Sequence, residues 1–161
     1  MLTEELRERD QHRAAGVLVY AKDTDNWLFI KRSSLVNSPD TWSVPGGHSE
    51  AGEVPWATAC REAQEEIGQD LRMWPHTVIW SQKSQVPTSA YVLFAVIVDE
   101  QFRPQLNWES SEHIWCKLDA IPTPRHWGID ALLSHNQAGE KLRAMIKRFN
   151  PDALFDVDIT S

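Results

Sequence analysis

The sequence has few cysteines and no long apolar run. Its two cysteines, Cys60 and Cys116, form neither a disulfide framework nor the spacing of a zinc site, which favours reduced thiols in a cytoplasmic protein. No apolar stretch is long enough to cross a bilayer, so we expect no membrane partner. Residues 1–10 are highly charged and lack the apolar centre of a secretory signal.

Positive charge is also scarce. The chain carries 16 Lys and Arg against 23 Asp and Glu, which gives a formal net charge of −7 at pH 7. Because nucleic-acid surfaces need basic patches, this balance argues against a nucleic-acid partner. It also means that any phosphorylated ligand requires cations at its own binding site.

The length of 161 residues fits one domain over 1–161, with a polar lead-in at 1–12 and a tail at 150–161 whose structure the sequence does not define. Alternating and β-branched apolar patterns predict strands, and longer periodic patterns predict helices. Strands on both sides of a central helix indicate a layered α/β or α+β domain. We expect strands at 14–20, 27–31, 77–80, 90–98 and 114–117, a helix at 55–67, and a helix at 128–149 with a break near 136–139.

The helix expected at 55–67 carries an unusual acidic face. Helical spacing of about 100° per residue places Glu62, Glu65 and Glu66 together, while an apolar stripe of Trp56, Cys60, Ala63 and Ile67 faces the core. Like charges at this spacing repel, and the helix dipole disfavours anions in the last turn. A divalent cation would remove both penalties, and clustered carboxylate oxygens suit Mg²⁺ or Mn²⁺.

Residues around this helix strengthen the metal hypothesis over the alternative, a solvated acidic helix face. Gly46 and Gly47 allow the backbone to approach a ligand closely. Glu53 stands just before the helix and can fold back toward the carboxylates. Arg61 lies among the acids, where a guanidinium can hold one of them through two hydrogen bonds.

The segment from Gly47 to Gln69 resembles the Nudix box, G-x(5)-E-x(7)-R-E-U-x-E-E-x-G-U, in which U is a bulky aliphatic residue. All seven fixed positions match, and the two aliphatic positions hold Ala63 and Gln69 instead. A later W-x-x-L-D segment at 115–119 also agrees, so the resemblance covers roughly residues 13–149. The matching fixed residues are Gly47, Glu53, Arg61, Glu62, Glu65, Glu66 and Gly68.

The resemblance implies an α/β/α sandwich with a mixed sheet, and it implies roles for individual residues. Glu65 and Glu66 match the metal-ligating pair, and Glu62 matches a further ligand or the general base. Arg61 matches the residue that orients the catalytic carboxylate. The remaining implied metal-binding positions are Glu53 as an auxiliary ligand, the carbonyl of Gly46, and a late acid for which Glu109 has better spacing than Glu112.

The implied activity is hydrolysis of a phosphoanhydride bond in a nucleoside diphosphate derivative or a nucleoside triphosphate, by in-line displacement with a carboxylate as base. Three other functions remain in view. A catalytically inactive binding or regulatory module would show an eroded box, and an isopentenyl diphosphate isomerase would carry a cysteine before it; residues 37–48 contain none. An unrelated domain with an acidic helix would lack affinity for divalent metals.

The substrate partner is a small nucleotide whose identity the sequence leaves open. The candidate substrate-binding residues are Arg32 and two of the eight tryptophans, Trp42 and Trp108, which approach the box from either side and can stack on a base.

Two subfamily markers concern the sequence after the box. ADP-ribose pyrophosphatases often carry a proline at the position of Gln85, and here the nearest proline is Pro87. Diadenosine polyphosphate hydrolases favour a tyrosine near this position, and no tyrosine lies between the box and Tyr91. A homodimer is left open, and His48, His76, His113 and His126 are further recognition candidates.

Overall fold

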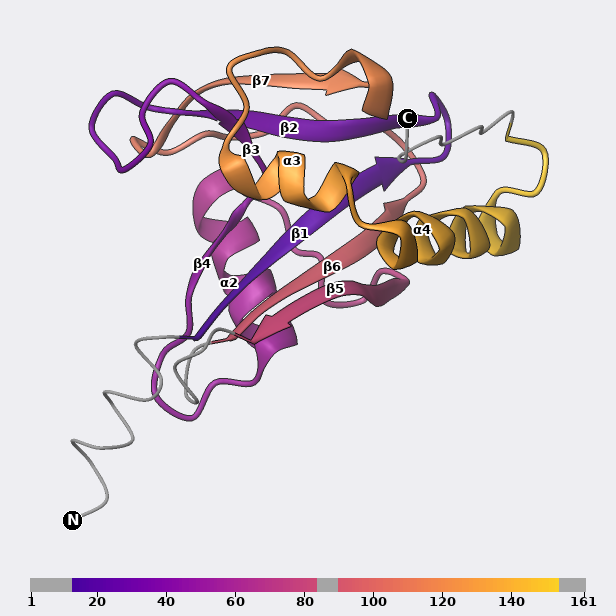
Figure 1. The fold of residues 1–161 in the computed structure, drawn as a ribbon, viewed down its shortest axis with the longest axis horizontal. Coiled ribbons are helices and arrows are strands. Elements are labelled where there is room, and N and C mark those ends of the chain that lie inside the picture. Colours follow the sequence, from indigo (N-terminus) through magenta and orange to yellow (C-terminus); the bar gives the residue numbers. More distant parts are fainter. Residues whose placement is uncertain (1–12, 84–89, 154–161) are drawn as a thin grey trace.

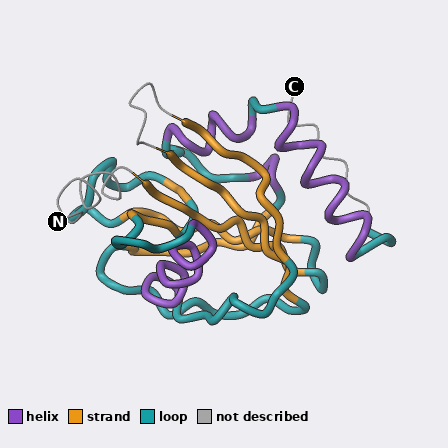
Figure 2. The backbone as a smooth tube through the Cα atoms, turned by 90° about the horizontal axis from the view of Figure 1, so that it is seen from below, coloured by secondary structure: helices purple, strands orange, loops and turns teal. Residues whose placement is uncertain are grey.

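The computed structural model describes residues 13–83 and 90–153, which form a mixed sheet with helices on both faces (Figures 1 and 2). This arrangement confirms the expected α/β architecture. Gln85 and Pro87 lie outside the described residues, as do the lead-in at 1–12 and the last part of the tail. The elements are β1 (Arg13–Ala21), β2 (Asn26–Arg32), β3 (Trp42–Ser43), β4 (Gly46–His48), α2 (Pro55–Ile67), β5 (His76–Lys83), β6 (Ala90–Val98), β7 (Ser110–Cys116), a short 3-10 helix (Leu118–Ala120), α3 (Trp127–Leu133) and α4 (Asn136–Phe149).

The seven strands follow the order β3-β2-β1-β6-β5, with β4 paired to β1 and β7 paired to β2. The β1–β6 ladder is parallel, and the other ladders between named strands are antiparallel. β1 and β2 form an antiparallel hairpin with Tyr20 opposite Trp27, and the apolar strand β6 lies between β1 and β5.

One edge of β1 is shared by two partners. Its end pairs with β2 at Tyr20 and Ala21, whereas its start pairs with β4 from Ala14 to Gly16. β2 and β4 therefore separate from one another along β1. This separation brings the loop before β4, and the glycines on β4, next to helix α2.

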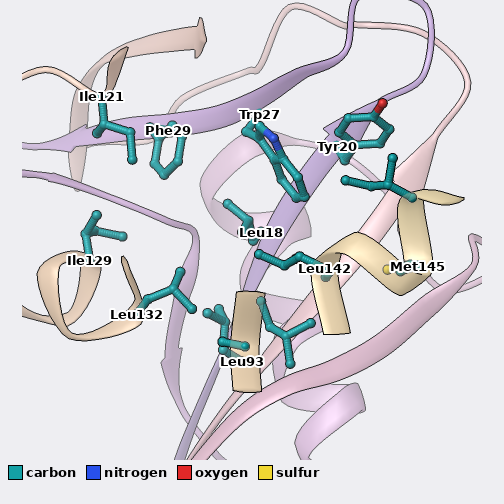
Figure 3. Packing of buried hydrophobic residues seen from close by; sticks show 14 of the residues in the cluster. Leu18, Tyr20, Trp27, Phe29, Leu93, Ile121, Ile129, Leu132, Leu142 and Met145 are labelled. Atoms are coloured by element: carbon teal, nitrogen blue, oxygen red, sulfur yellow. The ribbon is translucent and has the colours of Figure 1, made fainter. Parts of the chain in front are cut away.

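Alternation along the strands sends side chains to two different core layers. On one face, Val17, Val19 and Phe94 pack against Ala63 and Ile67 of α2. On the other, a second cluster lies beneath α3 and α4 (Figure 3). Its large buried members include Leu18, Tyr20, Trp27, Phe29, Leu93, Ile129, Leu132 and Leu142.

Most element boundaries agree with the sequence expectations, and α2 spans the predicted residues. Pro55 occupies the first turn, where its missing N–H costs nothing, and Gly68 ends the helix in the left-handed conformation with φ +68°. The break in the C-terminal helical region falls at Ser134 and His135, slightly before the expected position. Strand β7 starts earlier than expected because the polar residues from Ser110 onward pair with β2.

No helix in the described part of the chain is long and apolar enough to cross a membrane. Cys60 and Cys116 are both buried as free thiols, and burial raises the pKa of each thiol to about 11. Neither cysteine belongs to the acidic region described below.

Candidate active site

Two carboxylates of α2 are buried at the point where β2 and β4 separate. Glu62 is 9% exposed and Glu66 is 5% exposed, so the alternative of a solvated acidic helix face does not hold for these two residues. Glu66 accepts a hydrogen bond from the backbone N–H of Gly46 at 3.3 Å and shares a side-chain hydrogen bond with Glu62. Burial, followed by the contact with Glu62, raises the pKa of Glu66 far above its ordinary range. Burial beside Glu62 therefore favours the protonated form of Glu66 when no other cation is present.

Arg61 organises the acids around this pair. Its Nη1 lies 3.0 Å from Oε1 of Glu62 and 3.3 Å from Oε1 of Glu65, and its Nη2 donates to the carbonyl of His48 at 2.8 Å. Its Nε and Nη2 bind the two oxygens of Glu53 at 3.0 and 3.1 Å. One guanidinium thus fixes three carboxylates and the end of β4.

Glu53 is fully occupied by hydrogen bonds. Besides Arg61, it accepts from the Thr58 hydroxyl at 2.7 Å and from the backbone N–H of Glu50 at 3.1 Å. The bonds from Arg61 are the largest cause that lowers the pKa of Glu53 to about 2. The structure therefore uses Glu53 to hold Arg61, and service as a metal ligand would require it to leave these partners.

The two glycines of β4 are required by close contacts. A Cβ atom on Gly47 would lie 2.5 Å from the carboxyl carbon of Glu62, and one on Gly46 would lie 2.7 Å from the carbonyl oxygen of Ala15. Because real Cβ contacts are essentially never this short, any side chain here would displace Glu62 or the sheet. The backbone of β4 thus approaches the acids as the sequence suggested.

Glu109 reaches the same acids from the loop before β7. Burial and repulsion from Glu62 and Glu65 raise the pKa of Glu109, while Arg32 and a side-chain hydrogen bond with Glu66 oppose this change. Its backbone carbonyl accepts from the N–H of Ser33 at 2.8 Å, which ties the loop to the end of β2. Four carboxylates and the cation of Arg32 are therefore neighbours, although they come from three separate segments.

The chemistry of these donors fits a hard divalent cation. Glu62 and Glu66 are buried carboxylates in contact with one another, and a cation can offset the cost of burying their charge and satisfy oxygens from Glu109 as well. Among the described residues, no three His, Cys, Asp or Glu side chains are already gathered as a metal-binding group. Arg61 holds oxygens of both Glu62 and Glu65, so loading would require rearrangement of these side chains.

A cavity of about 460 Å³ opens beside this acidic cluster. Gly46 and Gly47 form part of its wall, so the glycines that contact the acids also face the cavity. Aromatic and apolar side chains from β5, β6 and α3 form most of the remaining wall. Among the described residues that line the cavity, Arg32 is the one with a permanently charged basic side chain. The aromatic and histidine residues in this wall are Trp80, Tyr91, Trp127, His48 and His126.

The structure distributes the three substrate-binding candidates differently. Arg32 lines the cavity. Trp42 is 8% exposed and belongs to the core cluster beneath α3, whereas Trp108 is 64% exposed and lies next to Glu109 in the chain. Neither tryptophan lines the cavity. Sequence reasoning missed Trp127, which is 65% exposed at the start of α3 and lines the cavity. The sequence signal for it was the segment His126-Trp127-Gly128, which follows the W-x-x-L-D segment.

Comparisons with known proteins agree with the geometry. Residues 10–136 match the family model of the NUDIX domain. The chain is 33% identical over 122 residues to diphosphoinositol polyphosphate phosphohydrolase 2 of Homo sapiens, covering 71% of this chain and 63% of that protein. It is 28% identical over 131 residues to the asymmetrical bis(5'-nucleosyl)-tetraphosphatase of Caenorhabditis elegans, covering 75% and 91%. The crystal structure of a C. elegans Ap4A hydrolase binary complex matches with a TM-score of 0.61 at 22% identity, covering 84% of this chain and 99% of that one.

The chain therefore belongs to the Nudix domain family, whose hydrolases generally use divalent metal ions. The match spans less than two thirds of the length of the human relative. The intact box argues against an eroded binding module, because every fixed position of the motif retains its residue and most of these residues contact one another.

Proposed function

We propose that this protein hydrolyses a phosphoanhydride bond in a nucleoside diphosphate derivative or a nucleoside triphosphate, with Mg²⁺ as the cofactor. The observation that carries the proposal is the buried pair Glu62–Glu66, joined by Glu109 and placed beside a cavity that contains Arg32. The acids supply the metal site, and the cavity supplies room for the nucleoside. Arg32 supplies the positive charge that an acidic protein needs for phosphate.

Glu66, Glu62 and Glu109 are the side chains proposed to hold Mg²⁺, with Glu65 and the carbonyl of Gly46 completing the set. When bound, Mg²⁺ neutralises negative charge on the phosphate oxygens and favours loss of a proton from the attacking water. Carboxylate and carbonyl oxygens suit this cation, since Mg²⁺ prefers oxygen ligands.

Glu62 is the carboxylate assigned to accept the proton from water. The Nη1 of Arg61, 3.0 Å from Oε1 of Glu62, fixes the orientation of this carboxylate. Arg61 itself is immobilised by Glu53 and by the carbonyl of His48. Glu53 is therefore a positioning residue for the base in this proposal, acting through Arg61.

The composition of the cavity favours a nucleoside over an inositol polyphosphate, the substrate class in the name of the human relative. Many phosphates on one small ring would require many cationic side chains. Among the described residues that line the cavity, Arg32 is the one Lys or Arg side chain, while Trp80, Tyr91 and Trp127 offer aromatic surfaces. Aromatic surfaces suit the stacking of a base, and a volume of about 460 Å³ is within the range of ordinary ligand pockets.

A hydrolysis panel tests this proposal. It should include nucleoside triphosphates, oxidised triphosphates, ADP-ribose, nucleotide sugars, dinucleoside tetraphosphates and a diphosphoinositol polyphosphate, each with Mg²⁺. We expect turnover of at least one nucleotide, with a nucleoside monophosphate or diphosphate among the products. Failure to cleave any nucleotide, or cleavage of the inositol compound alone, would contradict the proposal.

The variant Glu62→Gln serves as the matched negative control for the panel. It keeps the volume of the side chain but removes the charge needed for proton transfer and metal binding. We expect a loss of turnover of roughly 10²-fold or more, as general bases typically contribute this much. An unaffected rate would show that another group accepts the proton.

A further inference from the structure

His126 lines the cavity, and one of its ring nitrogens accepts a hydrogen bond from the backbone. It is the residue before α3, and its Nδ1 accepts a hydrogen bond from the backbone N–H of Gly128 at 3.1 Å. An imidazole nitrogen that accepts a hydrogen bond carries no proton, so in the neutral ring the proton is on Nε2. No hydrogen bond joins Nε2 to any of the residues that the structure describes. The ring therefore presents one N–H donor whose place is fixed by the backbone.

The surroundings of the ring favour the neutral form. Burial is the first cause that lowers the pKa of His126, and repulsion from Arg32 is the second. Arg32 is also close enough to Glu109 to lower the pKa of that carboxyl. Arg32 and His126 both line the cavity, and the charge of Arg32 acts on both His126 and Glu109.

We infer that the Nε2–H of His126 and the guanidinium of Arg32 together bind the phosphate attached to the nucleoside, at the junction between the cavity and the acids. This inference rests on the proposed function, because it requires a nucleotide in the cavity. It adds a specificity residue that distinguishes a nucleoside phosphate from a nucleoside. The two donors come from β2 and from the segment before α3.

A phosphate oxygen is the acceptor that fits this pair better than a base. The Nε of Arg32 donates to the carbonyl of Asn37 at 2.7 Å, which leaves its two terminal nitrogens for a ligand. Two donors that together carry one positive charge suit a phosphate. The apolar part of the cavity, which includes Leu93, Ile129 and Leu132, remains for the nucleoside.

The test is a comparison of binding by isothermal titration calorimetry, with no turnover involved. The probes are AMP, GMP, CMP and UMP and the four corresponding nucleosides, all in millimolar Mg²⁺. We expect the best monophosphate to bind at least about ten-fold more tightly than its nucleoside, and His126→Asn to reduce this ratio by roughly ten-fold, as expected for a charge-assisted hydrogen bond. The affinity for the nucleoside itself should change little.

His126→Asn is chosen because the asparagine oxygen can still accept from the N–H of Gly128 and cap α3. His135 provides a matched control, since its Nδ1 caps α4 by accepting from Ala138 at 3.2 Å and it does not line the cavity. His135→Asn should keep the wild-type ratio. If His126→Asn is poorly folded in a thermal scan, His126→Ser supplies the same capping with no ring.

Arg32→Met should reduce the same ratio as His126→Asn. An unchanged ratio in both His126 variants would overturn the inference, and so would a wild-type ratio near one or the absence of measurable monophosphate binding. These outcomes are separate from hydrolysis, because a monophosphate contains no anhydride bond. A protein that cleaves nucleotides but lacks the preference refutes the His126 inference alone, and a protein that shows the preference but cleaves nothing refutes the proposed activity alone.

Discussion

Arg61 and Glu53 are joined by two parallel hydrogen bonds, from Nε to Oε2 at 3.0 Å and from Nη2 to Oε1 at 3.1 Å. The carboxylate of Glu53 is 12% exposed and the side chain of Arg61 is 24% exposed, so the pair is only partly screened by solvent. The remaining nitrogen of Arg61 points at Glu62 and Glu65. The position of the proposed base, Glu62, therefore depends through Arg61 on Glu53, which lies just before α2.

Glu53→Gln should destabilise the protein in a pH-dependent manner. The folded state lowers the pKa of Glu53 from 4.5 to about 2, so its charge stabilises the fold above pH 4.5 and this contribution is lost as the pH falls through about 2. We expect a loss of the order of 2 kcal/mol in the free energy of unfolding at pH 7, shrinking toward zero near pH 2. Urea denaturation between these pH values measures it.

Glu50→Gln is the control for this prediction. Glu50 lies 3.6 Å from Nε of Arg61, but its side chain is 70% exposed, so we expect a change between zero and about 1 kcal/mol. Equal effects of the two substitutions would show that the buried geometry of Glu53 contributes nothing special.

Glu66→Gln should stabilise the metal-free protein while abolishing its response to Mg²⁺. Burial raises the pKa of Glu66, so the folded state retains a proton that the unfolded state releases above its ordinary pKa. Wild-type stability therefore falls as the pH rises through neutrality, and the variant escapes this loss. Thermal denaturation in EDTA from pH 5 to 8 should show a difference that grows with pH.

Addition of millimolar Mg²⁺ in the same experiment should raise the melting temperature of the wild type and not that of Glu66→Gln, because ligand binding to the folded state stabilises it. Glu65→Gln is a useful comparison, since Glu65 is 51% exposed and its removal should not change the metal-free pH dependence. A difference between wild type and Glu66→Gln that stays constant with pH would contradict the raised pKa of Glu66.

Gly47→Ala should reduce turnover with little loss of structure. The new Cβ would lie 2.6 and 2.8 Å from the oxygens of Glu62, so this carboxylate must shift. A displacement of about 1 Å at a catalytic group costs on the order of 10²-fold in rate.

Gly52→Ala is the control and should behave in the opposite way. Its new Cβ meets no atom within 4 Å, but alanine is strained at a φ of +76°, so stability should fall by about 1 kcal/mol while turnover is retained. Normal turnover in Gly47→Ala would refute the tight fit.

Trp127→Ala and Trp42→Ala separate substrate binding from core packing. Trp127 is 65% exposed and lines the cavity, so its loss should raise KM with little effect on stability. Trp42 is buried in the core, and its loss should cost about 3–5 kcal/mol in the free energy of unfolding. The pairing of a kinetic assay with urea denaturation distinguishes them. A raised KM in a fully stable Trp42→Ala would restore Trp42 as a base-binding residue.

Local sequence patterns were sufficient to predict helix α2 and the grouping of its acids. Pro55 and Gly68 mark its ends, and the spacing of Glu62, Glu65 and Glu66 places the acids together. The helix pattern could not predict that Glu62 and Glu66 are buried, because an acidic helix face is ordinarily solvated. Their burial depends on the tertiary structure, in which β2 and β4 pair with different parts of β1.

The cavity was beyond the reach of sequence analysis because distant segments build it. Trp42 was favoured as a base-binding residue since it is near Gly47 in sequence, but the structure packs it into the core cluster. Tyr91 and Trp127, which are far from the box in sequence, reach the cavity through β6 and α3. Nearness in sequence is a poor guide where strands bring residues together across the sheet.

The dependence of turnover on a divalent cation tests the central claim most directly. The measurement is the rate of hydrolysis of the best substrate in the panel, first in excess EDTA and then after titration with Mg²⁺. Because buried Glu62 and Glu66 are proposed to act only with a bound cation, we predict no detectable turnover in EDTA and full recovery when free Mg²⁺ reaches millimolar levels. Turnover that continues unchanged in excess EDTA would contradict the account.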